Sequence, residues 1–161
     1  MPEDQGATMS HSGLIFRAFN LYTGFFTFLS PLFDLVIRLW VAQVFFASGL
    51  TKIQSWSSTL ALFEYEYEVP LLPPSIAAVL GTAAELTLPV LIAVGLATRL
   101  SSLALFLFNL VAVYAYGSFL FSDEGAVGLQ QHILWGAFLA MLVFHGSGKL
   151  SLDHLLARRY R

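Results

Sequence analysis

Apolar residues dominate four long stretches of the sequence, and each is long enough to cross the hydrocarbon core of a bilayer, which takes about 20 residues. These stretches cover residues 32–53, 76–98, 101–121 and 130–147. The first two carry ionisable residues at interior positions, whereas the main polar interruption of the third is Asn109. The pattern predicts an all-α integral membrane protein built as a four-helix bundle.

Residues 14–30 are also apolar, but only Ser30 and Pro31 separate them from the first predicted span. That connection is too short for the chain to reverse direction. Arg17 and Asn20 lie among clustered phenylalanines, a mixture typical of helices in the headgroup plane. Because proline lacks a backbone N–H, we predict an N-terminal interfacial helix that ends at Pro31. The expected regions are a tail with this helix (1–31), the transmembrane domain (32–155) and a basic tail (156–161).

The segment between the first two predicted spans contains the run FEYEYEVPLLPP, in which acidic and aromatic residues alternate before three prolines. Alternation over residues 63–69 predicts a short extended or interfacial segment outside the bilayer. Three glutamates among aromatic residues are also a weak candidate for binding a cation, although carboxylates at alternating positions more often face water.

Basic residues are distributed unevenly between the two sides of the predicted bundle. One side collects Arg17, Arg99 and the C-terminal Lys149, Arg158, Arg159 and Arg161, whereas the other has only Lys52. Because Lys and Arg concentrate on the cytoplasmic side of membrane proteins, we expect both termini to be cytoplasmic.

The composition narrows the functional classes. The chain is 57% apolar, 15% aromatic and 11% charged, which excludes a soluble enzyme, a coiled coil and a disordered linker. A net charge of -2 with eight Lys and Arg leaves no basic stripe for a phosphate backbone, so we expect no nucleic-acid partner. The absence of cysteine excludes thiol chemistry and iron–sulfur clusters, so any redox role needs a carrier from elsewhere.

The ionisable residues of the first predicted span fall on one helix face. At about 100° per residue, this stripe contains Asp34, Arg38, Val41, Phe45, Ser48 and Lys52. The second span has a matching stripe with Gly81, Glu85, Leu88, Ile92 and Arg99. Two polar stripes on successive antiparallel helices are expected to pair.

Glu85 is the most deeply placed charge in the sequence. It lies ten residues from Ser75, or roughly 15 Å into a hydrocarbon core about 30 Å thick. A charge at that depth is costly and needs a partner, water or a function. Gln43 and Asn109 are expected at similar depth. Arg38 and Arg99 are expected nearer the side predicted to hold the two termini, and Lys52 and His132 nearer the opposite side.

Two interpretations of these residues remain open. Glu85 either neutralises Arg38 or Lys52 and fixes the helix register, or it belongs to a functional site. In the second case the candidate catalytic residues are Glu85, Arg38 and Lys52, and the candidate substrate-binding residues are Gln43, Asn109, His132 and Arg99. His132 and His145 are roughly 20 Å apart along one helix, so we expect no bis-histidine haem and no metal site.

Several of these residues occur in runs that resemble a known family. The runs RLWVAQVFFASGLTKI, AAELTLPVLIAVGLATRL and HGSGKLSLD are similar to the DoxX family of small four-helix membrane proteins over residues 32–155. The matching residues are Arg38, Ser48, Gly49, Lys52, Glu85, Gly95, Arg99 and Ser151 to Asp153. The string QSWSSTLALFEYEYEVPLLPP further resembles the DoxX branch found beside enzymes that modify copper-binding peptides.

The resemblance implies an inner (cytoplasmic) membrane location and a role beside an oxidoreductase or metal-stress system. We expect an accessory subunit that interacts with quinone through Glu85, Arg38 and Lys52, and a protein partner from that pathway in addition to membrane lipid. Whether the chain is an enzyme stays open, and a homo-oligomer is an open expectation. The alternatives are a non-catalytic component that binds or passes a substrate such as a metal-binding peptide, and a structural scaffold.

Overall fold

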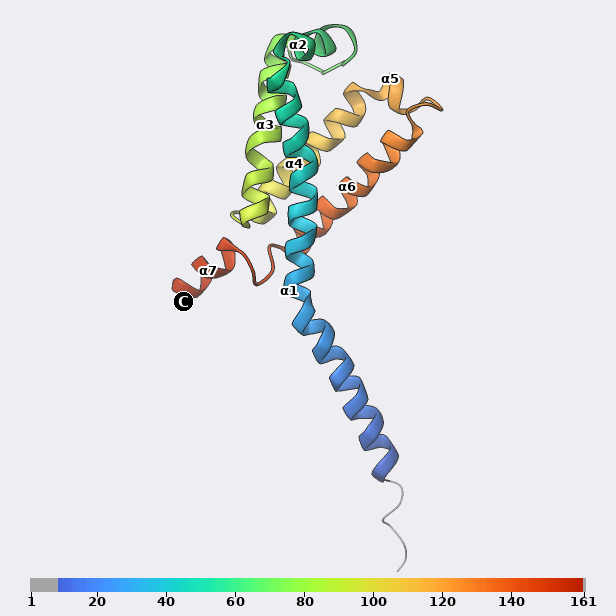
Figure 1. Ribbon diagram of the computed structural model, residues 1–161, viewed down its shortest axis with the longest axis vertical. Coiled ribbons are helices and arrows are strands. Elements are labelled where there is room, and N and C mark those ends of the chain that lie inside the picture. The colour runs from blue at the N-terminus through green and yellow to red at the C-terminus, as the bar shows by residue number, and fades with distance from the viewer. Residues whose placement is uncertain (1–8, 161) are drawn as a thin grey trace, which may run out of the picture.

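The computed structural model describes residues 9–160, and every regular element in that range is a helix (Figure 1). The helices are α1 (Met9–Gln54), α2 (Trp56–Tyr65), α3 (Pro74–Val94), α4 (Thr98–Ala115), α5 (Gly117–Leu120), α6 (Ala126–His145) and α7 (Leu152–Arg159). Among them, α1, α3, α4 and α6 are long and apolar enough to cross a membrane. The predicted all-α architecture with four membrane-spanning helices is therefore confirmed.

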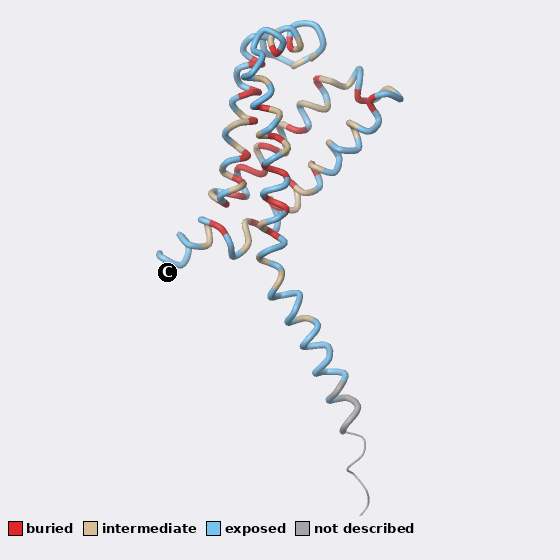
Figure 2. Tube along the Cα trace, in the orientation of Figure 1, coloured by how far each residue is buried: buried red, intermediate tan, exposed pale blue. Residues whose placement is uncertain are grey.

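Helix α1 continues through Pro31, so the predicted break at this residue is wrong. A proline inside a helix removes one backbone hydrogen bond and bends the helix; apolar surroundings favour continuation because the remaining backbone groups stay paired. Figure 1 shows α1 changing direction as it leaves the bundle. Residues 14–30 are helical as expected, and the part of α1 before Pro31 projects from the bundle with nearly all its described side chains exposed (Figure 2).

The alternating run 63–69, predicted to be an extended or interfacial segment, begins in helix α2 and does not form a strand. Residues 56–65 are helical, and only the chain from Glu66 to Pro73 lacks regular structure. Phe63 and Thr59 turn towards the bundle, and Phe63 packs with Ala77 and Ala78 of α3. This contact explains the helix, because three-to-four-residue spacing buries one face against α3 whereas strict alternation would not.

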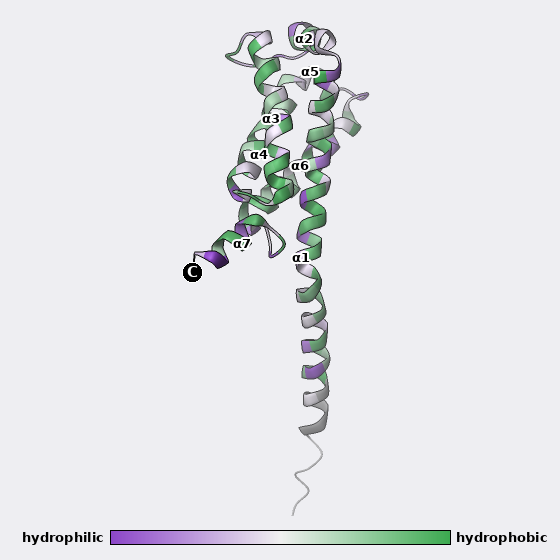
Figure 3. Ribbon diagram, turned by 60° about the vertical axis from the view of Figure 1, so that its left-hand side comes forward, coloured by the Kyte–Doolittle hydropathy of each residue, from purple (hydrophilic) through white to green (hydrophobic). Residues whose placement is uncertain are grey.

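The second half of α1 packs against α3, α3 against α4, and α4 against α6. A core of aliphatic and aromatic side chains fills the centre of the bundle. It contains Ile37, Val41, Phe45, Ile92, Leu105, Leu139 and Leu142. Many large apolar side chains are exposed on the outside of the bundle, as lipid contact requires. Figure 3 shows hydrophobic residues along most of the length of the long helices. We call the end that holds α7 and the projecting part of α1 the terminal end, and the opposite end the α2 end.

The turn between α3 and α4 is the anchor of the C-terminal segment. Gly95 ends α3 with a positive φ of 71°, a conformation that favours glycine. A Cβ at this position would overlap Ser151 and the guanidinium of Arg38. The backbone N–H of Asp153 donates to the carbonyl of Gly95 (2.9 Å), and the Asp153 carboxylate accepts from the N–H groups of Ala97 (2.7 Å) and Thr98 (2.9 Å).

The Asp153 carboxylate should stabilise the protein in a pH-dependent way. Partial burial opposes its charge, but hydrogen bonds from Thr98 and Ala97 outweigh this effect and hold the pKa of Asp153 below its usual value. Its contribution is therefore complete above the ordinary carboxyl pKa of about 4 and is lost as the pH falls through the lower folded pKa. We expect Asp153→Ala to reduce the free energy of unfolding by about 1 kcal/mol at neutral pH.

The measurement is unfolding of the two proteins in detergent between neutral and acidic pH. The difference between wild type and Asp153→Ala should shrink as the solution becomes acidic. A difference that stays constant over the whole range would contradict the role of the charged carboxylate.

Candidate functional site

Ser48, Lys52 and Glu85 form a buried polar cluster between α1 and α3 towards the α2 end. The Lys52 Nζ atom lies 2.8 Å and 2.7 Å from the two carboxylate oxygens of Glu85. Ser48 accepts a hydrogen bond from Lys52 Nζ (3.0 Å) and donates one to Glu85 Oε1 (3.1 Å). The side chains of Lys52 and Glu85 are only 14% and 7% exposed. The predicted pairing of the two stripes is confirmed, and Lys52 is the partner of Glu85.

The local sequence explains how two helices place charges so close together. Ser48 and Lys52 are four residues apart, so they share one face of α1. Gly49 permits the close approach of α3, because a Cβ there would lie 2.9 Å from the Leu86 side chain. Pro89 lacks an N–H and therefore leaves the backbone carbonyl of Glu85 without its helical donor. The carboxylate thus lies where the α3 backbone offers a further acceptor.

A cavity of about 380 Å³ adjoins this cluster, and we call it the α2-end cavity. Its walls come from α1, α2, α3, α4, α6 and the turn that follows α2, and they are mainly apolar. Apolar members include Phe63, Leu80, Phe108 and Val111, and the polar members include Ser48, Lys52, Glu85, Tyr67 and His132. The volume falls in the range typical of small-molecule sites, roughly 300–1,000 Å³.

His132, which lines this cavity, forms a second polar pair with the buried Asn109. The Asn109 side-chain amide donates from Nδ2 to the backbone carbonyl of His132 (3.0 Å), which fixes the amide orientation. Its Oδ1 atom therefore faces His132 Nδ1 at 2.8 Å and accepts a hydrogen from it. A neutral His132 ring then carries its lone pair on Nε2. The Trp135 ring packs edge-on against the imidazole with a centroid separation of 4.9 Å.

Tyr67 is a cavity residue that the sequence analysis did not identify. It follows α2 and packs edge-on against Phe63 and Tyr116, with centroid separations of 5.0 Å and 5.1 Å. Burial, followed by the nearby Tyr116, Glu85 and Glu66, raises the pKa of Tyr67 and keeps its hydroxyl neutral. In the sequence its signal is the same as that of an interfacial aromatic residue, so only the fold of the turn distinguishes it.

Arg38 lies apart from Glu85, so the structure divides the three predicted catalytic residues. Arg38 precedes Lys52 by 14 positions on α1, or about 21 Å along the helix axis. Its fully buried guanidinium donates to the carbonyls of Ile92 (3.3 Å) and Ala93 (3.2 Å) and to the carbonyl of Leu150. Arg38 therefore joins the end of α3 to the loop between α6 and α7.

The predicted midplane layer of Gln43, Glu85 and Asn109 does not form. Gln43 is exposed on the outer side of α1, because it lies outside the stripe that faces α3. Asn109 pairs with His132 instead. Arg99 lies at the terminal end, where it donates to the carbonyl of Phe144 (3.3 Å). The structure therefore brings together Lys52, Glu85 and His132 around the α2-end cavity, with Asn109 bonded to His132, and places Gln43, Arg38 and Arg99 elsewhere.

Acidic and histidine side chains do not gather into a metal site in the described range. No group of three His, Asp or Glu residues lies close enough there to hold an ion. His145 Nε2 lies 3.4 Å from Asp34 Oδ1 at the terminal end, far from His132 on the same helix.

The chain is similar to known proteins in both family and individual comparisons. The DoxX family model matches residues 33–118, more than half of the chain. An uncharacterized protein of Haemophilus influenzae is 31% identical over 132 residues, which cover 78% of this chain and 84% of the relative. No solved structure matches the chain. With four helices suited to crossing a membrane and a family match over most of the bundle, the protein belongs to the DoxX family.

Proposed function

We propose that the protein is an accessory membrane subunit of an oxidoreductase system and binds a quinone in the α2-end cavity. The observation that carries this proposal is a buried, hydrogen-bonded Lys52–Glu85 pair lining an otherwise mainly apolar cavity of about 380 Å³. A buried ion pair is a weak source of stability. Stability therefore does not explain why the pair is present. Binding the polar head of a ligand whose apolar body fills the rest of the cavity does explain it.

The donors and acceptors of the cavity fit a quinone and its quinol form. The carbonyl oxygens of a quinone accept hydrogen bonds, and Lys52 and the neutral Tyr67 hydroxyl are donors. The hydroxyls of a quinol donate, and the Glu85 carboxylate and His132 Nε2 are acceptors. The aromatic and aliphatic wall, with Phe63 and Phe108, suits the ring.

The absence of cysteine favours an accessory subunit over a self-sufficient enzyme. The sequence has no cysteine, so thiol exchange and a cysteine-ligated iron–sulfur cluster are excluded as its own chemistry. Electrons would therefore pass between the bound quinone and a partner protein of a redox or metal-stress pathway. The basic residues of the terminal end support an inner-membrane orientation with both termini in the cytoplasm.

Binding of ubiquinone by the purified protein tests the proposal. We expect native mass spectrometry and organic extraction to find quinone with wild type, and Glu85→Gln to lower its retention about tenfold or more, because a charge-assisted acceptor is lost. Glu124→Gln is the matched control, since Glu124 is an exposed acid away from the cavity. Equal retention by wild type and Glu85→Gln would contradict the proposal.

A second variant separates binding from folding. Ala112 lines the cavity from α4 and takes no part in the hydrogen bonds of the ion pair, so we expect Ala112→Phe to fill the space and to leave the Lys52–Glu85 hydrogen bonds in place. We expect this variant to lose quinone as Glu85→Gln does. Quinone bound at the wild-type level in a folded Ala112→Phe protein would place it outside this cavity.

The α2 end also supports a second candidate function, a component that binds or passes a metal-binding peptide. Glu64, Glu66 and Glu68 line an open hollow of about 340 Å³ together with Tyr65 and Tyr67. Acidic and aromatic side chains of this kind suit a cationic segment of a partner. In cells that also carry the enzymes modifying a copper-binding peptide, substitution of the three glutamates by glutamine should then reduce peptide export or metal tolerance. Unchanged phenotypes would reject this second function.

A further inference from the structure

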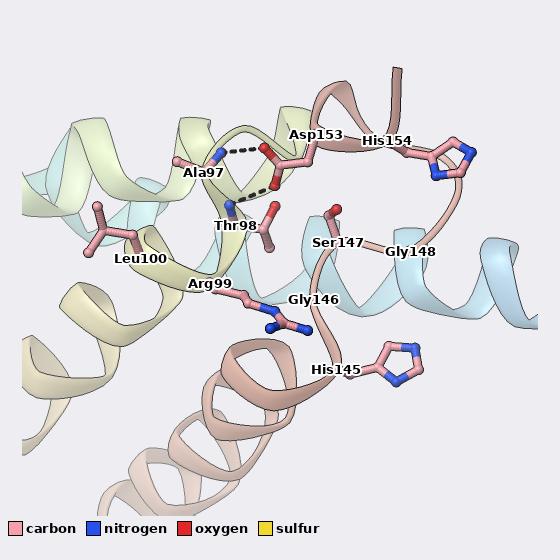
Figure 4. Close-up of a pocket in the computed structure, with 10 residues that line it drawn as sticks. All are labelled: Ala97, Thr98, Arg99, Leu100, His145, Gly146, Ser147, Gly148, Asp153 and His154. Atoms are coloured by element: carbon pink, nitrogen blue, oxygen red, sulfur yellow. Dashed lines mark hydrogen bonds between the residues drawn. The ribbon is translucent and has the colours of Figure 1, made fainter. Parts of the chain in front are cut away.

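A polar crevice of about 540 Å³ lies at the terminal end, separate from the α2-end cavity. It is formed by the start of α4, the loop that follows α6 and the first turn of α7 (Figure 4). Its polar members are Thr98, Arg99, His145, Ser147, Asp153 and His154. None of these residues contributes to the proposed quinone site.

Arg99 supplies the main cationic group of the crevice. A guanidinium has five N–H donors, and within the described residues that of Arg99 makes one hydrogen bond, to the carbonyl of Phe144. Figure 4 shows its side chain directed towards the loop at Gly146. A Cβ at Gly146 would lie 3.4 Å from Arg99 Nε, so the glycine leaves the guanidinium uncovered on that side. Most donors of Arg99 remain available to a ligand.

The acidic residue of the crevice does not neutralise Arg99. Both oxygens of Asp153 accept hydrogen bonds from the first N–H groups of α4, at Ala97 and Thr98 (Figure 4). Asp153 thus occupies the N-terminus of α4, where the helix dipole stabilises its negative charge. An external anion therefore cannot use this helix terminus and has to be bound by the crevice's cationic side chains.

The surroundings identify the class of anion. Leu100, which lines the crevice, is 70% exposed, and the neighbouring Phe144 is 83% exposed, as expected for side chains that contact lipid tails. Lys149, Arg158 and Arg159 add positive charge at the same end of the bundle. Basic groups beside apolar surface at the end of membrane helices bind anionic headgroups. A free phosphate would gain nothing from the apolar neighbours.

We propose that this crevice binds the phosphate of an anionic phospholipid, with Arg99 as its principal ligand. The headgroup phosphate accepts hydrogen bonds from the guanidinium, which binds phosphate in a bidentate way. His154 and Ser147 provide further polar contacts at the rim, and an acyl chain extends along Leu100 and Phe144.

Native mass spectrometry of the purified chain, titrated with phosphatidylglycerol or phosphatidylcholine, tests the site. We expect wild type to bind phosphatidylglycerol more tightly, and Arg99→Gln to weaken that binding about tenfold. Lys149→Gln is the matched control, because it removes the same charge from the same end without lining the crevice. Its effect should be less than about threefold. Equal losses in both variants would overturn the proposal, since only the overall charge would then matter.

A second variant and a competitor complete the test. Ser147→Asp adds a carboxylate inside the crevice and should weaken phosphatidylglycerol binding even if Arg99→Gln fails to fold. Inorganic phosphate is added as the competing probe. Failure to displace the lipid supports a headgroup site. Full displacement, with no preference between the two lipids, would overturn the lipid assignment in favour of a free phosphate.

Discussion

Removing one member of the Lys52–Glu85 pair should destabilise the protein more than removing both. Glu85→Leu leaves the Lys52 ammonium buried without its carboxylate, a situation that costs roughly 3–5 kcal/mol. In the double variant Lys52→Met, Glu85→Leu no charge remains, and replacement of a buried pair by apolar side chains is often neutral or stabilising. We therefore expect the double variant to recover most of the stability lost in Glu85→Leu.

The measurement is a double-mutant cycle on the free energy of unfolding in bicelles, with Lys52→Met as the other single variant. Glu124→Leu serves as the control for removal of an exposed carboxylate. Additive losses in the two single variants would contradict the pairing. The double variant should also lose quinone while keeping its fold, which separates the contribution of the pair to stability from its proposed function.

Arg38→Met should have an effect of similar size at the other end of α1. The guanidinium is fully buried and donates to the carbonyls of Ile92, Ala93 and Leu150, so its loss removes all three contacts. The Ile92 carbonyl keeps the backbone N–H of Gly95 as a donor (3.1 Å). It also removes the arginine one turn from the buried Asp34, whose remaining basic neighbour is His145, with Nε2 3.4 Å from Asp34 Oδ1. We expect a loss of roughly 3–5 kcal/mol, the cost of breaking a buried charged network by removal of one partner.

Hydrogen exchange distinguishes this effect from general destabilisation. The N–H of Asp153 donates to Gly95, so it should exchange much faster in Arg38→Met once the C-terminal segment is released. Arg99→Met is the matched control, because Arg99 is an exposed arginine with one carbonyl contact, and it should cost no more than about 1 kcal/mol. Unchanged exchange at Asp153 in Arg38→Met would contradict the anchoring role of Arg38.

The sequence predicted the spans and the helix faces because both depend on local regularities. A stretch of about 20 apolar residues specifies a membrane span, and the angle of 100° per residue specifies which side chains share a face. The stripe from Asp34 to Lys52 is therefore recovered in the structure, with its members turned towards the bundle interior. Gln43 lies outside that stripe, and the same angular argument explains its exposure.

The helical periodicity could not predict which residue pairs with Glu85. Arg38 and Lys52 share one face of α1, so the angular position cannot choose between them. The choice depends on how far α3 is shifted along α1, which is set by contacts such as the close approach at Gly49. The site residue Tyr67 was missed for a related reason, because its position depends on the turn after α2.

The two elements that differ from the prediction are those in which a local sequence pattern was outweighed by the packing or the apolar environment of the segment. Pro31 predicted the end of a helix, but a proline in an apolar helix can bend it without ending it. The alternating residues 63–69 predicted an extended or interfacial segment, but burial of Phe63 against α3 favours a helix over an extended chain at the start of that run. The interfacial position of the projecting part of α1 stays a prediction.

The anchoring of the C-terminal segment by Arg38 sets an order of events during biosynthesis. Its acceptor at Leu150 is 112 residues further along the chain, so at about 5–20 residues per second the ribosome needs roughly 5–20 s to deliver it. During that interval the nascent chain holds a cation inside the membrane with Asp34, one turn away, as its nearest counter-charge. The contacts of Arg38 are therefore completed only after Leu150 is synthesised, and a polypeptide that stops before Leu150 leaves this guanidinium with the carbonyls of Ile92 and Ala93 alone.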